Sequence, residues 1–210
     1  EELKASTISL QEKENLVREI HHRVKNNMQI ISSMLRLQSH VLKDEKLNQV
    51  FEDCQSRITA MALIHEMLYM GSNFKFTNLE SYLKKLCHHI NISYRPKNSK
   101  IDYDIEVEKG IFLDLDTIIP LGLILNECVS NIYKHAFQDG IGHYYVKINK
   151  SNNSVRVKIG DNGKGIDDSP KKNGLGNQLI EVLVEQLDGS ITLSSENGLH
   201  YDLVFDQAKL

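Results

Sequence analysis

The first seventy residues alternate apolar and polar positions with the period of an α-helix. Between residues 8 and 70 the chain has neither proline nor glycine. Apolar residues recur every three or four positions along residues 8–42 and again along 47–70, and the polar run 43–46 separates the two patterns. This predicts two antiparallel helices with apolar stripes too broad for one hairpin to bury. We therefore expect two hairpins to pair as a homodimeric four-helix bundle.

After Gly71-Ser72-Asn73 the pattern changes, and we place a domain boundary there, giving domains 1–71 and 72–210. A capping-box sequence at residues 77–80 predicts the start of a helix. Helical spacing predicts helices over residues 79–92, 117–137 and 177–187, and two-residue alternation predicts strands over 101–107, 144–150, 155–159, 190–195 and 199–205. Helices combined with mostly antiparallel strands favour a two-layer α/β sandwich, so the whole chain is of the α+β class.

Composition excludes several classes of protein. The 25 Lys and Arg residues against 28 Asp and Glu give a net charge of −3, which offers no basic surface for general nucleic-acid binding. No apolar run approaches the ~18–20 residues that span a bilayer, and the charged N-terminus lacks a signal peptide. Three widely spaced cysteines disfavour a disulfide framework or a zinc ribbon. We expect a cytoplasmic protein without membrane contact in this segment, and the helical pattern at residue 1 suggests the C-terminal part of a longer protein.

Two adjacent histidines lie in the middle of the first predicted helix. At about 100° per residue, and with Val17 and Ile20 taken as the seam, His21 points about 70° from the seam and His22 about 170°. We therefore expect His21 to border the core and His22 to face solvent. His65 falls at a seam position of the second helix, where an ordinary core histidine is expected.

An exposed imidazole has nucleophilic chemistry available at neutral pH. It is largely unprotonated, and its nitrogen lone pair can attack phosphorus. The basic side chains near His22 would suit an incoming polyphosphate; they are Arg18, Arg23 and Lys25. From the helix alone, the pattern favours an ordinary solvated surface residue at His22 over a reactive one.

One face of the helix predicted over residues 117–137 gathers polar groups. Glu127, Asn131, Lys134 and His135 fall within an arc of about 100° at α-helical spacing. A carboxylate, an amide oxygen and an ammonium on one face can hold hydrated Mg²⁺ and phosphate oxygens together. A solvated helix edge would give the same pattern.

Two glycine motifs follow in the chain. In DNGKG at residues 161–165, Gly163 and Gly165 allow close approach of a ligand, and Asp161 can accept a hydrogen bond from a base amine. In NGLG at residues 173–176, Gly174 and Gly176 open a helix whose N-terminus favours anions. Each motif alone also occurs in ordinary turns, and both the P-loop and the Rossmann fingerprint are absent from the sequence.

Together these segments resemble the histidine kinases of two-component signalling whose phosphoacceptor helix reads HRVKN, and the second half resembles the GHKL (Bergerat-fold) ATPase domain. The resemblance extends from about Glu12 to Phe205. It implies that ATP and Mg²⁺ are the cofactors and that His22 is the phosphoacceptor. By position, it implies that Asn131 is the Mg²⁺ ligand, that Lys134 and His135 lie near the phosphates, that Asp161 binds the adenine amine beside Gly163 and Gly165, and that Gly174 and Gly176 form the phosphate-side loop.

The chain departs from the family pattern at several points. Glu127 stands where many histidine kinases have Asn, and its role is open between orienting the Mg²⁺ shell and activating the nucleophile. The segment 166–173 is short for an ATP lid. Arg23 replaces the acidic residue that often follows the phosphorylated histidine, which makes Glu19, one turn before His22, a candidate to orient the imidazole.

The resemblance implies an ATP-dependent autokinase that phosphorylates His22 and passes the phosphoryl group to an aspartate of a response-regulator receiver domain. One alternative is a GHKL serine kinase or ATPase. Another is a phosphotransfer or dimerisation module without catalysis.

Overall fold

The computed structural model describes residues 2–41, 44–70, 79–137, 139–165 and 174–206. They belong to two compact units, Glu1–Phe74 and Lys75–Leu210, which we call the helical unit and the sheet unit. The domain boundary predicted near residue 71, the capping residues Thr77 and Asn78, and the lid segment 166–173 lie outside the described residues. Those expectations remain predictions.

The helical unit is a hairpin of two long helices, as expected. Helix α1 (Glu2–Val41) packs along α2 (Glu45–Met70). Asp44 caps α2, since its Oδ1 accepts a hydrogen bond of 3.3 Å from the Leu47 backbone N–H. None of the helices in the described residues combines the length and apolar content needed to cross a membrane.

The face of α1 that meets α2 differs from the expected seam. Ile20, part of the expected seam, is 52% exposed, and Ile31 and Met34, which continue the seven-residue repeat of that seam along α1, are 49% and 60% exposed. The α2-facing side instead carries His21 and Lys25, which contact side chains of α2. The apolar positions of α1 form two stripes, and one hairpin buries only one of them, so the heptad repeat alone could not identify which.

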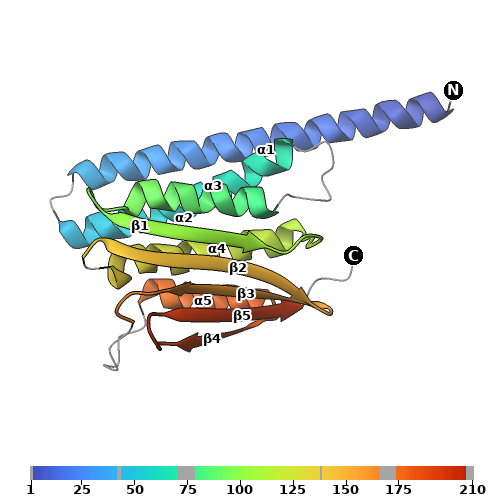
Figure 1. Ribbon diagram of the computed structural model, residues 1–210. Coiled ribbons are helices and arrows are strands. Elements are labelled where there is room, and N and C mark those ends of the chain that lie inside the picture. The colour runs from blue at the N-terminus through green and yellow to red at the C-terminus, as the bar shows by residue number, and fades with distance from the viewer. Residues whose placement is uncertain (1, 42–43, 71–78, 138, 166–173, 207–210) are drawn as a thin grey trace. The chain divides into compact units, whose positions relative to one another are not determined.

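The sheet unit follows the predicted order of elements (Figure 1). Its helices are α3 (Leu79–Tyr94), α4 (Leu115–Asn131) and α5 (Leu175–Gln186), with a π-helical turn, η1 (Ile132–Ala136), directly after α4. Its strands are β1 (Lys100–Val107), β2 (Ile141–Ser151), β3 (Ser154–Asp161), β4 (Ser190–Ser194) and β5 (His200–Asp206). They form one mixed sheet in the order β1-β2-β3-β5-β4, which confirms the α+β class.

Alternation along the strands produces the two layers. Tyr144, Val146 and Ile148 of β2 are fully buried beneath the helices, which cover one face of the sheet (Figure 1). The opposite face carries cross-strand polar pairs such as Lys147 with Glu106 and Arg156 with Asp202. Helix α4, whose apolar run LGLIL is buried on every side, lies at the centre of the core.

Two details differ from the expected fold. Strand β1 pairs with β2 in parallel, with α4 and η1 as the crossover, while the other pairs are antiparallel. The helix expected to continue to residue 137 is α-helical only to Asn131 and then widens into η1. Helical propensity does not distinguish the two forms, and π-turns are frequent at functional sites.

Candidate functional site

Most of the singled-out residues of the sheet unit surround one hollow of about 390 Å³, which we call the Asp161 pocket. It lies where α4 passes into η1, where β3 ends and where α5 begins. The predicted residues that line it are Asn131, His135, Asp161, Gly165, Gly174 and Gly176. Glu127, Lys134 and Gly163 are not among the described residues that line it.

Asp161 presents an unused hydrogen-bond acceptor. It ends β3, is 3% exposed, and its Oδ1 accepts a hydrogen bond of 2.8 Å from the Gly163 backbone N–H. Its Oδ2 is buried and has no hydrogen-bond partner among the described residues. Burial raises the pKa of the Asp161 carboxyl, although the hydrogen bond from Gly163 acts in the opposite direction. A buried acceptor left unsatisfied is costly, so the pocket is suited to a ligand that donates an N–H to Asp161.

The DNGKG motif packs against the end of η1. A Cβ at position 163 would stand 2.5 Å from the carbonyl oxygen of Ala136, and the Lys164 backbone N–H donates to the same oxygen at 3.3 Å. Gly165 adopts φ +69°, a left-handed conformation that favours glycine. Gly163 thus permits the loop to pack closely against η1 behind the pocket, while Gly165 lies in the wall of the pocket.

Asn131 is the last α-helical residue before η1 and lines the pocket. The buried Tyr201 of β5 hydrogen-bonds to the Asn131 side chain, and burial raises the pKa of the Tyr201 hydroxyl. This contact fixes the amide, whose oxygen is a hard donor of the kind that Mg²⁺ prefers.

The π-turn separates two side chains that α-helical spacing had placed together. His135 is exposed and lines the pocket, whereas the Lys134 ammonium lies 5.1 Å from the centre of the Tyr94 ring. A π-turn has more residues per turn than an α-helix, so an arc calculated at 100° per residue does not hold beyond Asn131.

Glu127 lies on α4 one turn before Asn131 and is 5% exposed. Its Oε2 points toward the first turn of α5, where an ideal Cβ at Gly176 would stand 2.8 Å away. Its Oε1 is 3.4 Å from the Asn126 side-chain nitrogen. The carboxylate therefore lies between α4 and the N-terminus of α5, a location that favours negative charge.

The start of α5 forms another wall of the pocket. Gly174 is the N-cap residue in an extended conformation, and its carbonyl oxygen accepts a 3.0 Å hydrogen bond from the Asn177 N–H. The N-cap residue is a glycine and therefore has no side chain with which to cap the helix. The first backbone N–H groups of α5 therefore lie beside the pocket, where they suit an anionic ligand.

Six pocket residues were not singled out from the sequence: Ile132, Ala136, Asn177, Leu193, Leu199 and Tyr201. Strand alternation could have indicated Tyr201, because it shares the inward face of β5 with Leu203 and Phe205. Nothing in the sequence pattern distinguished the other five. Ile132, Ala136 and Asn177 adjoin predicted residues in η1 and α5, whereas Leu193 and Leu199 reach the pocket only through the approach of the β4–β5 hairpin to β3.

The helical unit carries the second set of candidate residues. His22 is exposed, as expected, while His21 is half-buried. The Glu19 carboxylate accepts a 2.8 Å hydrogen bond from Arg23 Nε, and both side chains are exposed. The expectation that Glu19 orients His22 therefore competes with an i,i+4 ion pair to Arg23.

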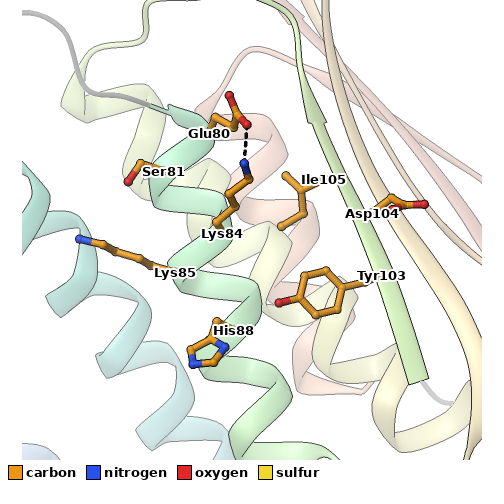
Figure 2. Close-up of a pocket in the computed structure, with 8 residues that line it drawn as sticks. All are labelled: Glu80, Ser81, Lys84, Lys85, His88, Tyr103, Asp104 and Ile105. Atoms are coloured by element: carbon orange, nitrogen blue, oxygen red, sulfur yellow. Dashed lines mark hydrogen bonds and ion pairs between the residues drawn. The ribbon is translucent and has the colours of Figure 1, made fainter. Parts of the chain in front are cut away.

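A second hollow of about 830 Å³ lies between α3 and β1, away from the nucleotide motifs (Figure 2). Tyr103 points from β1 toward α3, and Lys84 pairs with Glu80 at 2.6 Å. This hollow is larger but shallower than the Asp161 pocket and contains none of the candidate residues. Size therefore does not identify the reactive site in this protein.

Family models match both units. A histidine kinase model of the HisKA_2 type matches residues 19–94. A second model, described as a histidine kinase-, DNA gyrase B- and HSP90-like ATPase, matches residues 116–209 and implies ATP binding. The two matches contain His22 and the Asp161 pocket respectively.

Curated relatives agree with these models. The chain is 30% identical over 200 residues to the sensor histidine kinase PdtaS of Mycolicibacterium smegmatis, which covers 90% of this chain and 39% of the relative. It is 26% identical over 186 residues to blue-light-activated histidine kinase 2 of Erythrobacter litoralis, covering 84% of this chain and 52% of the relative. The chain thus spans about two fifths to one half of the length of these relatives.

Solved structures support the fold. The blue-light-activated histidine kinase EL346 of Erythrobacter litoralis superposes with a TM-score of 0.68 at 22% identity, over 90% of this chain and 58% of that one. Its separate histidine kinase domain gives a TM-score of 0.66 at 19% identity, over 84% and 95%. With the fold, the glycine-lined pocket and both family models in agreement, the chain belongs to the histidine kinases that join a HisKA_2 domain to a GHKL-type ATPase domain.

Proposed function

We propose that the protein is an ATP-dependent histidine autokinase of two-component signalling. ATP binds in the Asp161 pocket, His22 receives the γ-phosphoryl group, and an aspartate on the receiver domain of a response regulator takes it over. The observation that carries this proposal is the buried, unpartnered Oδ2 of Asp161 in a glycine-lined pocket, in the same chain as an exposed histidine.

The pocket fits a nucleotide at both of its ends. The Asp161 Oδ2 accepts a hydrogen bond from the exocyclic amine of adenine, beside Gly165 and apolar side chains such as Leu199. The phosphates lie toward the N-terminus of α5 at Gly174 and Gly176. A Mg²⁺ ion held by the Asn131 side-chain oxygen and the phosphates would neutralise negative charge there.

Two basic side chains are candidates to contact the phosphate oxygens of ATP. His135 lines the pocket and is the first candidate to contact phosphate oxygens. Lys134 also remains a candidate, but its ammonium would have to leave the Tyr94 ring to reach them. Gly163 supports the adenine end of the pocket from behind by holding Asp161 in place.

Phosphoryl transfer begins with in-line attack of an imidazole nitrogen of His22 on the γ-phosphorus. The nitrogen–phosphorus bond forms as the bond from phosphorus to the β,γ-bridging oxygen breaks, ADP leaves, and the imidazole releases a proton to solvent. In the second transfer a receiver carboxylate attacks the same phosphorus, the phosphorus–nitrogen bond breaks, and the imidazole regains a proton.

We also propose that two copies of the helical unit pair. Leu16, Ile20, Ile31 and Met34 of α1 are 49–65% exposed in the single chain. At about 100° per residue they fall within about 60° of one another, on a stripe that does not face α2. A second hairpin would bury this stripe, whereas His22 lies on neither the stripe nor the side that faces α2.

Incubation with γ-labelled ATP tests the proposed function. We expect label that is lost in acid and stable in base, located at His22, and absent from His22→Gln. Exposed His88 on α3 provides the matched control, because His88→Gln should label as the parent does. Acid-stable label, or equal label on His22→Gln, would contradict the proposal.

A mixture of two inactive variants then distinguishes transfer within a chain from transfer between chains. His22→Gln retains its nucleotide pocket, and Asp161→Asn retains its phosphoacceptor. Label in the mixture requires a dimer in which one protomer phosphorylates the other. Absence of label in the mixture, under conditions in which the parent is labelled, indicates transfer within a protomer.

A further inference from the structure

A pair of imidazoles lies between α1 and α2, directly beside the phosphoacceptor. The Nδ1 atoms of His21 and His65 are 3.1 Å apart, and the ring centroids are 5.4 Å apart with the planes tilted by 51°. Both residues are half-buried. The contact with the other imidazole therefore fixes the position of each ring.

The contact between the two Nδ1 atoms limits the protonation states that the His21 and His65 rings can adopt together. A hydrogen bond between two Nδ1 atoms needs one ring to donate a proton and the other to offer a lone pair, so the two rings cannot both be fully protonated. Burial and the neighbouring His21 lower the pKa of His65, which favours its neutral form.

A second polar contact follows one turn along α1. The Lys25 ammonium lies 3.0 Å from the Glu66 carboxylate of α2. Apolar positions such as Val24 and Met28 make up the adjoining part of this face of α1. Apolar side chains tolerate small rotations and shifts of a helix, whereas directional polar contacts between helices specify one arrangement.

We propose that His21 and His65 are positioning residues for the phosphoacceptor, an inference that rests on the proposed function. Successive residues of a helix are about 100° apart, so a contact that holds His21 against α2 directs the next side chain away from the seam. The imidazole pair thus fixes the rotation of α1 about its axis and keeps His22 at the surface, and Lys25 with Glu66 supports the same rotation.

Three substitutions of His65 test this inference. His65→Leu removes the polar contact and keeps an apolar group in the seam. His65→Asn keeps an amide close to the place of the imidazole Nδ1, while His65→Gln extends its amide toward the place of Nε2 and serves as the matched control. The kcat of autophosphorylation should fall about tenfold in His65→Leu and His65→Gln and stay within about threefold of the parent in His65→Asn.

The KM for ATP should not change in any of these variants, because the nucleotide pocket belongs to the sheet unit. The thermal midpoint of His65→Leu should equal or exceed that of the parent, since apolar replacement of a half-buried polar pair is often neutral or stabilising. Loss of kcat without loss of stability indicates positioning. Equal kcat in all three variants, or losses of kcat that follow losses in thermal midpoint, would overturn the inference.

A chemical readout is independent of kinase activity. Diethylpyrocarbonate modifies accessible neutral imidazoles, and mass spectrometry follows the modification of His22. We expect its rate to change at least twofold in His65→Leu and to match the parent in His65→Asn. If the parent is not phosphorylated on His22, the proposed function fails even when this pattern is observed; an unchanged rate in His65→Leu refutes the positioning role alone.

Discussion

The Glu127 carboxylate occupies the space into which a side chain at position 176 would project. An ideal Cβ on Gly176 would stand 2.8 Å from Glu127 Oε2, closer than real side chains approach. Two helices that border the nucleotide pocket meet at this point. Glycine at 176 is therefore explained by a protein carboxylate, before any contact with phosphate is considered.

Replacing this glycine tests that relationship. Gly176→Ala should lower the free energy of unfolding by about 1–2 kcal/mol, because the new methyl group displaces the buried Glu127 carboxylate or the first turn of α5. Gly174→Ala is the matched control for stability: a Cβ at 174 meets no atom within 4 Å, and φ is −66°. Equal stability of the two variants in urea denaturation would contradict this explanation.

Asp161→Asn should separate nucleotide binding from folding. The Asn side-chain oxygen can still accept the hydrogen bond from Gly163, but a buried amide cannot satisfy the adenine amine as the carboxylate does. We expect the Kd for ATP, measured by calorimetry, to rise about 100-fold or more. An unchanged Kd would show that the base does not bind at Asp161.

The effect of Asp161→Asn on the free energy of unfolding should depend on pH. Burial raises the pKa of the Asp161 carboxyl in the folded state, so the ionised form opposes folding at pH values above that pKa. This cost is fully present above the raised pKa and disappears as the pH falls below the unfolded pKa of about 3.9. The stability gained by Asp161→Asn should therefore be largest near neutrality and shrink in acid, as compared by urea denaturation at several pH values.

Pairing of two helical units should depend on the exposed stripe of α1. Met34→Lys places a charge in the proposed dimer interface and should convert dimers to monomers, measured by light scattering with size-exclusion chromatography. Ser33→Lys changes the adjacent, exposed position on a different face and should leave the mass unchanged. A parent that is monomeric at micromolar concentration would refute the pairing.

The ion pairs on the face of the sheet opposite the helices should contribute little to the free energy of unfolding. Arg156 Nε donates to Asp202 at 2.8 Å, and the arginine is exposed. We expect Arg156→Gln to change the free energy of unfolding by less than about 1 kcal/mol and to leave the Kd for ATP unchanged. A larger effect in chemical denaturation would indicate that this face is covered in the working protein.

Periodicity predicted the fold well because most elements bury one regular face. The strand expected over residues 101–107 is found at Lys100–Val107, and the helix expected over 117–137 begins at Leu115. The stripe of α1 that meets α2 could not be chosen from the sequence, because the helix has two apolar stripes and only contacts across the hairpin decide between them. Ile20 accordingly lies on the exposed stripe, whereas His21 faces α2.

The candidate site was predicted in part. Asp161 and Asn131 both line the pocket, since their positions depend on local motif order, and their binding roles stay predictions. Lys134 was placed at the pocket by α-helical geometry, which does not extend through a π-turn. Tyr201 reaches Asn131 only through pairing of β5 with β3, a long-range contact that one sequence does not reveal.

The order of the strands also determines where the sheet unit can accept inserted residues. Strands β2 and β3 form a local hairpin, as do β4 and β5, and the ladder from Gly160–His200 to Ser154–Asp206 joins the two. This ladder brings together the two ends of the segment between β3 and β5, which contains both glycine motifs. Closure entropy grows only by about 0.6 kcal/mol for each doubling of loop length, so insertions between the motifs should be tolerated without loss of the scaffold.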